Sequence, residues 1–338
     1  MSESSLAIIG GESLLGREVR ELLSERSISS RLKLIGAEEE TEGIFSEAQG
    51  EAVVITKLDE ENLAGAELAF LAGPTASSRK ALELSAKTNP HPALIDLTHG
   101  LEEQPNARLR APMVEPAGYE VPNDAVHSIA HPAAIVLALF FNRLQGRHPI
   151  RRSIVQVFEP ASERGKSGLN ELQQQTVNLL SFKNLDKNVF DEQLSFNMLP
   201  RYGSEAPEAL EAVELRIDRH LATLLAMTGR TPMPSLRLSQ APVFHGYSFS
   251  VWVEFDEKPD LEKIGKDLDS ALIELRGTDV APPTNVGAAG QVGITVGTVE
   301  ADRNDPRAAW FWIVADNLRI AAENAVLVAE SLLAKRKA

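Results

Sequence analysis

The sequence predicts a two-domain α/β protein whose N-terminal domain is doubly wound around a parallel sheet. The chain has 338 residues, of which 43% are hydrophobic and 24% charged, so it is long enough to form two cores. Its early part alternates short apolar runs with helical patterns, which is typical of a parallel sheet covered by helices. Its later part has longer strands with alternating apolar residues, which is typical of a sheet with one covered face.

The N-terminal domain begins with an apolar run at residues 6–10 that ends in glycine, followed by helical spacing over 14–23. This order indicates a strand, a tight turn and a helix. Alternation then continues, with strands expected at 32–35, 68–72 and 93–97 and a helix at 77–86. We place this domain at residues 1–130.

The second domain is expected at residues 131–314, because the pattern changes after an apolar helix at 131–144. Its further elements are strands at 153–158, 235–238, 248–255 and 310–314 and helices at 168–180 and 207–227. Pro207 is expected in the first turn of its helix. A last, amphipathic helix within 315–338 is expected to complete the N-terminal domain.

Composition excludes several classes of function. The formal net charge of −14 opposes binding to nucleic acid or to an anionic membrane surface. No apolar stretch reaches the roughly 20 residues of a spanning helix, and residues 1–5 lack the basic start of a signal peptide, so we expect a cytoplasmic protein. The chain has no cysteine, which excludes disulfides, thiolate metal sites and a cysteine nucleophile.

Three strings carry a family resemblance: FDEQLSFNMLP at 190–200, QAPVFHGYS at 240–248, and VADNLR at 314–319 with NAV at 324–326. In this order they resemble the aspartate-semialdehyde dehydrogenase family, especially its Usg-like branch, over nearly the whole chain. The resemblance implies a Rossmann-type N-terminal domain and a dehydrogenase-like α/β (α+β) domain that forms a homodimer. It also implies reductive dephosphorylation of an aspartyl phosphate with NADPH.

The glycine-rich turn departs from the family pattern. The family has glycine at three positions, where this chain has Gly10, Ser13 and Gly16, with Gly11 beside the first. The side chain of Ser13 makes the approach of a cofactor phosphate harder. The family's later glycine is also missing, because residues 320–322 read IAA. We therefore expect weakened binding of NADP or NAD, and the alternative is that the glycines only shape the turn.

The nucleophile position departs as well. In the family, a cysteine at the start of a helix attacks the acyl carbon. The matching string here is IAHPAA at 129–134, so the cysteine position falls at Ala133 or Ala134. His131 takes the position of an asparagine, where a helix cap or a packed imidazole is favoured over a catalytic role.

Other positions of the implied pocket have also changed. The resemblance places Glu159 at the glutamine that binds the acyl substrate, Gln240 at the arginine that clamps its carboxylate, and Tyr247 at the general-base histidine. The phosphate-binding arginine of the family falls near Glu102. The resemblance allows a basic substrate contact at Arg216, but an ordinary surface arginine on a helix is the favoured interpretation. The resemblance therefore predicts that thiol-dependent semialdehyde oxidation is lost, and we assign no catalytic residue.

Two functions follow from these changes. One is a regulatory or ligand-binding homodimer with a small-molecule ligand, and the alternative is an NAD(P)-dependent oxidoreductase with thiol-free chemistry and Tyr247 as proton donor. In the implied fold, His131, Glu159 and His245 converge, which is a ligand set suited to zinc or iron. Ordinary packed or solvated side chains are the favoured interpretation, so we assign no metal site.

Overall fold

The computed structural model describes the chain except for residues 1–3, 27, 29, 38–42, 44, 49–50, 230, 278 and 338. Most of the N-terminal stretch that we compared with a signal peptide therefore lies outside the described residues. The chain divides into two compact units, Met1–Ala130 with Ala321–Ala338 (unit 1) and His131–Ile320 (unit 2). The second boundary lies inside the last helix, whereas the sequence-based division places it just before that helix.

Unit 1 is built on a six-stranded sheet with the order β2-β1-β5-β6-β8-β7. Its strands are β1 (Ser4–Ile9), β2 (Ser30–Ile35), β5 (Leu68–Leu71), β6 (Ala93–Asp96), β7 (Ala107–Arg110) and β8 (Val126–Ile129). All neighbouring strands pair in parallel. Every residue of β5 and β8 is buried, as expected for a parallel sheet with both faces covered. The sheet is that of a Rossmann-type domain.

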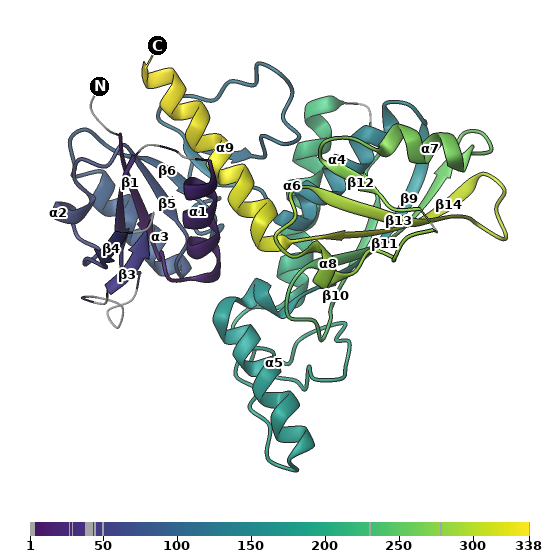
Figure 1. Cartoon of the computed structure of the whole chain (residues 1–338), viewed down its shortest axis with the longest axis horizontal. Coiled ribbons are helices and arrows are strands. Elements are labelled where there is room, and N and C mark those ends of the chain that lie inside the picture. The colour runs from purple at the N-terminus through teal and green to yellow at the C-terminus, as the bar shows by residue number, and fades with distance from the viewer. Residues whose placement is uncertain are drawn as a thin grey trace. The chain divides into compact units, whose positions relative to one another are not determined.

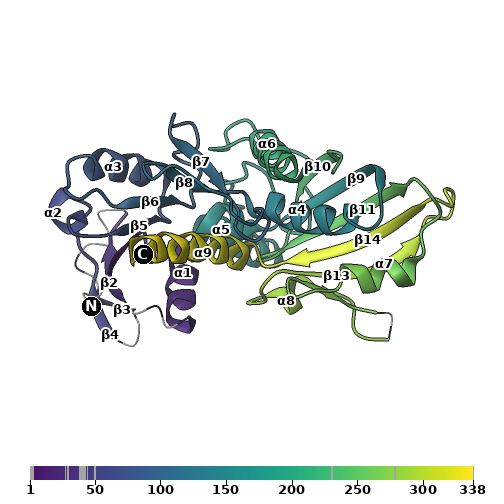
Figure 2. The ribbon, with the colours of Figure 1, turned by 90° about the horizontal axis from the view of Figure 1, so that it is seen from above.

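Helices cover both faces of this sheet. Figure 2 shows α3 (Thr75–Ser85) on one side and α1 (Leu14–Glu25) with α9 (Asn317–Lys337) on the other. The chain leaves β1 toward β2 and leaves β5 in the opposite direction toward β6. Right-handed crossovers therefore bring α1 and α3 to opposite faces. The smaller elements are α2 (Glu60–Leu63) and the hairpin strands β3 (Phe45–Ala48) and β4 (Glu51–Val54).

Unit 2 contains a mixed sheet with the order β10-β9-β11-β14-β13-β12. Its strands are β9 (Ile150–Glu159), β10 (Ser235–Gln240), β11 (Tyr247–Phe255), β12 (Ile273–Leu275), β13 (Ile294–Ala301) and β14 (Ala308–Ala315). Strands β9, β11, β14 and β13 are antiparallel, whereas β10 and β12 pair in parallel at the edges.

Three helices form a layer on one face of the unit 2 sheet: α4 (Pro132–Gln145), α6 (Leu210–Thr228) and α7 (Leu261–Leu268) (Figure 1). Helix α4 is apolar and buried around most of its circumference, because it lies between the sheet and the other two helices. No helix in the described part of the chain is both long enough and apolar enough to cross a membrane.

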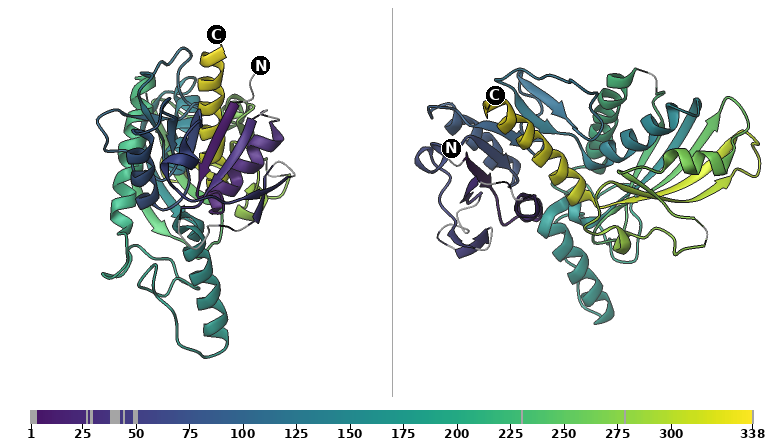
Figure 3. Two further views of the ribbon diagram at one scale, coloured as in Figure 1. Left: turned by 90° about the vertical axis from the view of Figure 1, so that its left-hand side faces the viewer. Right: turned by 45° about the horizontal axis from the view of Figure 1, so that its top comes forward.

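Two helices of unit 2 lie outside this layer. Figure 3 shows α5 (Gly165–Leu180) extending away from the sheet, directly after the short 3₁₀ helix η2 (Ala161–Arg164), and α8 (Asn285–Ala288) is a single turn. The expected position of Pro207 in the first turn of α6 is wrong. Ala209 is the N-cap, in extended conformation, so Pro207 lies in the segment that leads into the helix.

Candidate functional site

The candidate site lies in unit 2, where α4 begins. His131 is the N-cap of this helix, and its Nδ1 accepts a hydrogen bond from the Ala133 amide at 3.3 Å. Its own amide donates to Nδ1 of His220 on α6 at 2.9 Å. Ala133 and Ala134, in the first turn, are fully buried. The implied nucleophile position is therefore occupied by a methyl side chain that is packed in the core.

Glu159, the last residue of β9, is fully buried among hydrogen-bond donors. Arg164 Nη2 donates to its Oε1 at 2.6 Å, and the Tyr247 hydroxyl donates to its Oε2 at 3.3 Å. Burial raises the pKa of Glu159, while the Arg164 guanidinium opposes that rise. Burial disfavours the charge of Arg164, yet Glu159 raises the pKa of the guanidinium well above its usual value. The two groups form an ion pair inside the unit.

The side-chain amide of Gln240 is bound by hydrogen bonds within the chain. Its Oε1 accepts from the Tyr202 hydroxyl at 2.6 Å, and its Nε2 donates to the backbone carbonyls of Glu159 at 2.8 Å and Ala241 at 3.1 Å. Burial raises the pKa values of both phenols, Tyr202 and Tyr247, so both stay protonated at neutral pH. Gln240 therefore orders the end of β10 against β9.

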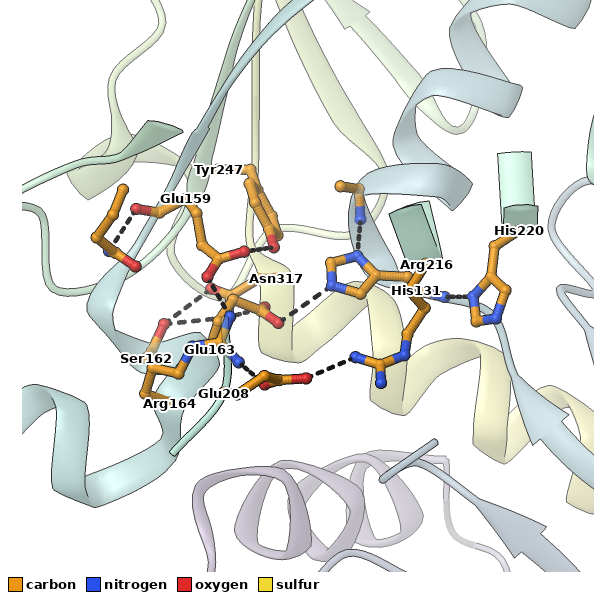
Figure 4. A network of polar contacts seen from close by, with 12 residues as sticks. His131, Glu159, Ser162, Glu163, Arg164, Glu208, Arg216, His220, Tyr247 and Asn317 are labelled. Carbon is orange, nitrogen blue, oxygen red and sulfur yellow. Dashed lines mark hydrogen bonds and ion pairs between the residues drawn. The ribbon is translucent and has the colours of Figure 1, made fainter. Parts of the chain in front are cut away.

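A second polar group forms around Asn317, the first residue of α9 (Figure 4). Its Nδ2 donates to Oε1 of Glu163 at 2.8 Å, and its Oδ1 accepts from the Gly246 amide at 3.0 Å and the Ser162 hydroxyl at 3.2 Å. Oε2 of Glu163 lies 3.7 Å from His131 Nε2. Burial, and then the charge of Glu159, raise the pKa of Glu163 to about 7.

Arg216 joins the site from α6 through a shared carboxylate. Its Nη1 donates to Oε1 of Glu208 at 3.1 Å, and Arg164 Nη1 donates to Oε2 of the same carboxylate at 2.6 Å. Figure 4 shows the chain of charges Glu159, Arg164, Glu208 and Arg216. The two arginines are thus bridged by a carboxylate of this chain.

The structure brings together most of the residues expected at the pocket. Figure 4 shows four of them in one network of polar contacts: His131, Glu159, Tyr247 and Arg216. Within the described residues, no three His, Cys, Asp or Glu side chains are placed to hold a metal ion, so His131, Glu159 and His245 do not form the zinc or iron ligand set considered above. Nε2 of His131 lies beside Glu163 instead.

Sequence reasoning missed five residues of the site: Tyr202, Glu163, Arg164, Glu208 and Asn317. A signal existed for three of them. Glu163 and Arg164 lie four and five positions after Glu159, which the resemblance already aligns with the family, and Asn317 lies within the VADNLR string. Nothing in the sequence around Tyr202 or Glu208 distinguishes them from ordinary polar residues.

The glycine-rich turn and Glu102 lie in unit 1. Gly10 has a φ of +81°, and a Cβ there would lie 2.6 Å from the Gly73 backbone. A Cβ on Gly16 would lie 2.3 Å from the Gly10 carbonyl oxygen, and one on Gly11 would lie 3.0 Å from a methyl of Leu34. These close approaches require glycine at residues 10 and 16.

The remaining two residues of the turn, Glu12 and Ser13, make polar contacts within the chain. Ser13 Oγ accepts the Gly16 amide at 2.9 Å and so occupies a donor that a phosphate would use. Although burial opposes it, hydrogen bonds from Ser46 and Arg17 lower the pKa of Glu12, so its carboxylate is ionised. Arg20 also pairs with Glu12, at 2.7 Å.

A Rossmann-type unit and a mixed-sheet unit, with a polar site where a buried helix begins, place the chain among the two-domain α/β proteins. The family described as semialdehyde dehydrogenase, dimerisation domain, matches residues 142–320. The aspartate-semialdehyde dehydrogenase of Rickettsia bellii is 26% identical over 337 residues, and the alignment covers 97% of each chain. A USG-1 protein homolog of Pseudomonas aeruginosa is 30% identical over 341 residues, also covering 97% of each.

Solved structures agree with these relatives. The structure of a probable aspartate-semialdehyde dehydrogenase from Pseudomonas aeruginosa superposes with a TM-score of 0.86 at 30% identity, covering 98% of this chain and 99% of that chain. The chain belongs to the semialdehyde dehydrogenase family, in the group of aspartate-semialdehyde dehydrogenases and USG-1 protein homologues. The resemblance found in the sequence is thereby confirmed.

Proposed function

We propose that this protein is a non-catalytic, ligand-binding homodimer of its family. The observation that carries the proposal is the replacement of the nucleophile: Ala133 and Ala134 are buried in the first turn of α4, and the 338-residue chain contains no cysteine. Without a thiolate the covalent acyl intermediate cannot form, and no other change in the pocket compensates for that loss.

The rest of the pocket supports the same proposal. Gln240 is bonded to Tyr202 and to backbone carbonyls, so it offers no charge to a substrate carboxylate. Tyr247 is fully buried, and burial raises its pKa well above 10, so the phenol cannot accept a proton at neutral pH. The clamp and the general base implied by the family are therefore both replaced by residues that bond within the chain.

The proposed homodimer would form through the open face of the unit 2 sheet. Phe311 of β14 packs on Phe140 of α4, with ring centroids 5.1 Å apart, so this face of β14 meets the helices. The opposite face carries Ile154, Trp252 and Trp310 side by side across β9, β11 and β14. Ile154 is 54% exposed and Trp310 is 42% exposed. A second subunit would remove this apolar row from water.

A thiol-free, NAD(P)-dependent oxidoreductase is the second candidate. It is favoured by Glu163, whose pKa of about 7 and position 3.7 Å from His131 Nε2 supply a group that exchanges protons near neutral pH. It is disfavoured by Glu12 and Ser13 in the glycine-rich turn, which oppose a pyrophosphate. We propose that NADP and NAD bind weakly.

The deciding experiment is a turnover assay with aspartate semialdehyde, phosphate and NADP, followed by NADPH absorbance. We expect no phosphate-dependent NADPH formation above that of heat-denatured protein. Ala133→Cys and Ala134→Cys should not restore turnover, because Gln240 and Tyr247 still occupy the clamp and base positions. A rate comparable to that of an active family member, run alongside as the control, would overturn the proposal.

A further inference from the structure

The carboxylate of Glu208 lies between two guanidinium groups in the way that a bound ligand would. One oxygen faces Arg164 at 2.6 Å, at the end of η2, and the other faces Arg216 at 3.1 Å, on α6. Charge-assisted hydrogen bonds of this kind are the usual means of holding a carboxylate. The two arginines are 52 positions apart in the sequence, and the carboxylate is what links them.

Glu208 is the exchangeable member of this group. It lies before α6, and its side chain is 36% exposed, whereas the side chains of Arg164 and Arg216 are only 14% and 21% exposed. Glu159, the other carboxylate on Arg164, is fully buried on a strand and bonded also to Tyr247. Glu208 is therefore the carboxylate of this group that can move into solvent when a competing anion arrives.

Arg164 would remain in place after such an exchange. Its Nη2 donates to Glu159 at 2.6 Å, its Nε faces the Tyr202 hydroxyl at 3.3 Å, and the guanidinium lies over the Tyr202 ring. Displacement of Glu208 would take away the one carboxylate that bonds to both arginines, and an incoming carboxylate could replace it at the same donors.

We propose that Arg164 and Arg216 form a binding site for the carboxylate of a small acidic ligand, and that Glu208 occupies this site in the ligand-free protein. The proposal rests on the ligand-binding role proposed above and gives that ligand a chemical class. It places the carboxylate between η2 and α6, and away from Gln240, whose amide is bonded to Tyr202 and to backbone carbonyls.

The test is calorimetric titration of the full-length chain with succinate at constant ionic strength. Glu208→Gln keeps the size of the side chain and removes its charge, so the dissociation constant for succinate should fall at least tenfold relative to the unmodified chain. Arg216→Gln in the Glu208→Gln background should abolish that gain. The matched control is Glu211→Gln, which removes the same charge from an exposed position at the start of α6 and should leave the affinity unchanged.

Three outcomes would overturn the proposal. One is an equal gain in succinate affinity from Glu208→Gln and Glu211→Gln, which would indicate that the loss of any negative charge strengthens binding. The second is a gain for inorganic phosphate as large as that for succinate, and the third is no gain at all in folded Glu208→Gln. Glu208→Asp is the second variant. It keeps the charge on a shorter side chain that cannot bridge both arginines. Its affinity for succinate should lie between that of the unmodified chain and that of Glu208→Gln.

These results are separable from the test of the proposed function. Turnover by the unmodified chain would reject the non-catalytic role whatever Glu208→Gln does. Absence of turnover together with an unchanged affinity in Glu208→Gln would reject only the carboxylate site.

Discussion

The carboxyl group of Glu163 keeps its proton near neutral pH because burial and the charge of Glu159 raise its pKa from a usual value of 4.5 to about 7. Between these two values the folded chain binds the proton and the unfolded chain has lost it. The free energy of unfolding therefore decreases as the pH rises from 4.5 toward 7, and this contribution levels off above 7.

Glu163→Gln should remove this pH dependence. Glutamine keeps an acceptor for Asn317, so the variant should lie within about 1 kcal/mol of the unmodified chain at pH 5 and exceed its stability at pH 8, by about 3 kcal/mol as an upper limit. Urea denaturation at pH 5, 6, 7 and 8 measures the difference, with exposed Glu211→Gln as the control. Parallel stability curves for Glu163→Gln and the unmodified chain would contradict the raised pKa.

The sequence identified some pocket residues and not others, for a physical reason. Glu159, Gln240 and Tyr247 stand in strings that could be compared with a family, so their positions were available before the structure. The bridge from Arg164 to Glu208 spans 44 positions and depends on how η2 and the start of α6 are folded together. No local pattern encodes a pairing of that kind.

The turn between β1 and α1 carries a carboxylate, Glu12, and a hydroxyl, Ser13, that we propose weaken dinucleotide binding. We expect NADPH to bind the unmodified chain weakly, and Glu12→Gln with Ser13→Gly to tighten binding at least tenfold, because the variant lacks the carboxylate and frees the Gly16 amide. Calorimetry measures both constants. Glu21→Gln, which removes one charge from an exposed position of α1, is the control.

A dissociation constant in the low micromolar range for the unmodified chain would show that the turn tolerates both residues. The double variant should then differ little from it. That result would favour the oxidoreductase alternative.

Individual helices and strands followed the sequence patterns where apolar residues dominate. Strands β1, β2, β5 and β6 and helices α1 and α3 lie where the pattern predicts them. Strands β7 (ARLR) and β8 (VHSI) were not predicted, because polar residues interrupt their apolar runs. Two of these polar residues contact each other across β7 and β8, with Arg110 Nη1 3.0 Å from His127 Nδ1. These two strands are therefore held by contacts between distant residues, which an apolar sequence pattern does not reveal.

The molecule as a whole is predicted to be a homodimer through the row of Ile154, Trp252 and Trp310. An obligate interface of this kind buries roughly 2,000 Å² or more and does not dissociate at working concentrations. Light scattering at micromolar concentration should give twice the 36.8 kDa of one chain. Ile154→Glu should shift the mass to that of a monomer, because it would bury a charge in the interface.

The control for the dimer is Leu215→Glu. Leu215 is 56% exposed on α6, in the layer on the other face of the sheet, so the charge should leave the mass unchanged. A mass near 36.8 kDa for the unmodified chain would reject both the dimer and the assignment of the open sheet face.

The division of the chain into two units has a consequence for the order in which the protein forms during synthesis. Unit 2 is one continuous stretch, whereas unit 1 consists of residues 1–130 and 321–338. The Met113 amide donates to Asn324 Oδ1 at 3.1 Å, and Arg26 pairs with Glu323 and with Glu330 at 3.0 Å. These bonds join residues more than 200 positions apart. Residues 1–130 are made before unit 2, yet their sheet gains its helix only after residues 321–338 have been made, so unit 1 is completed only after all of unit 2 has been synthesised.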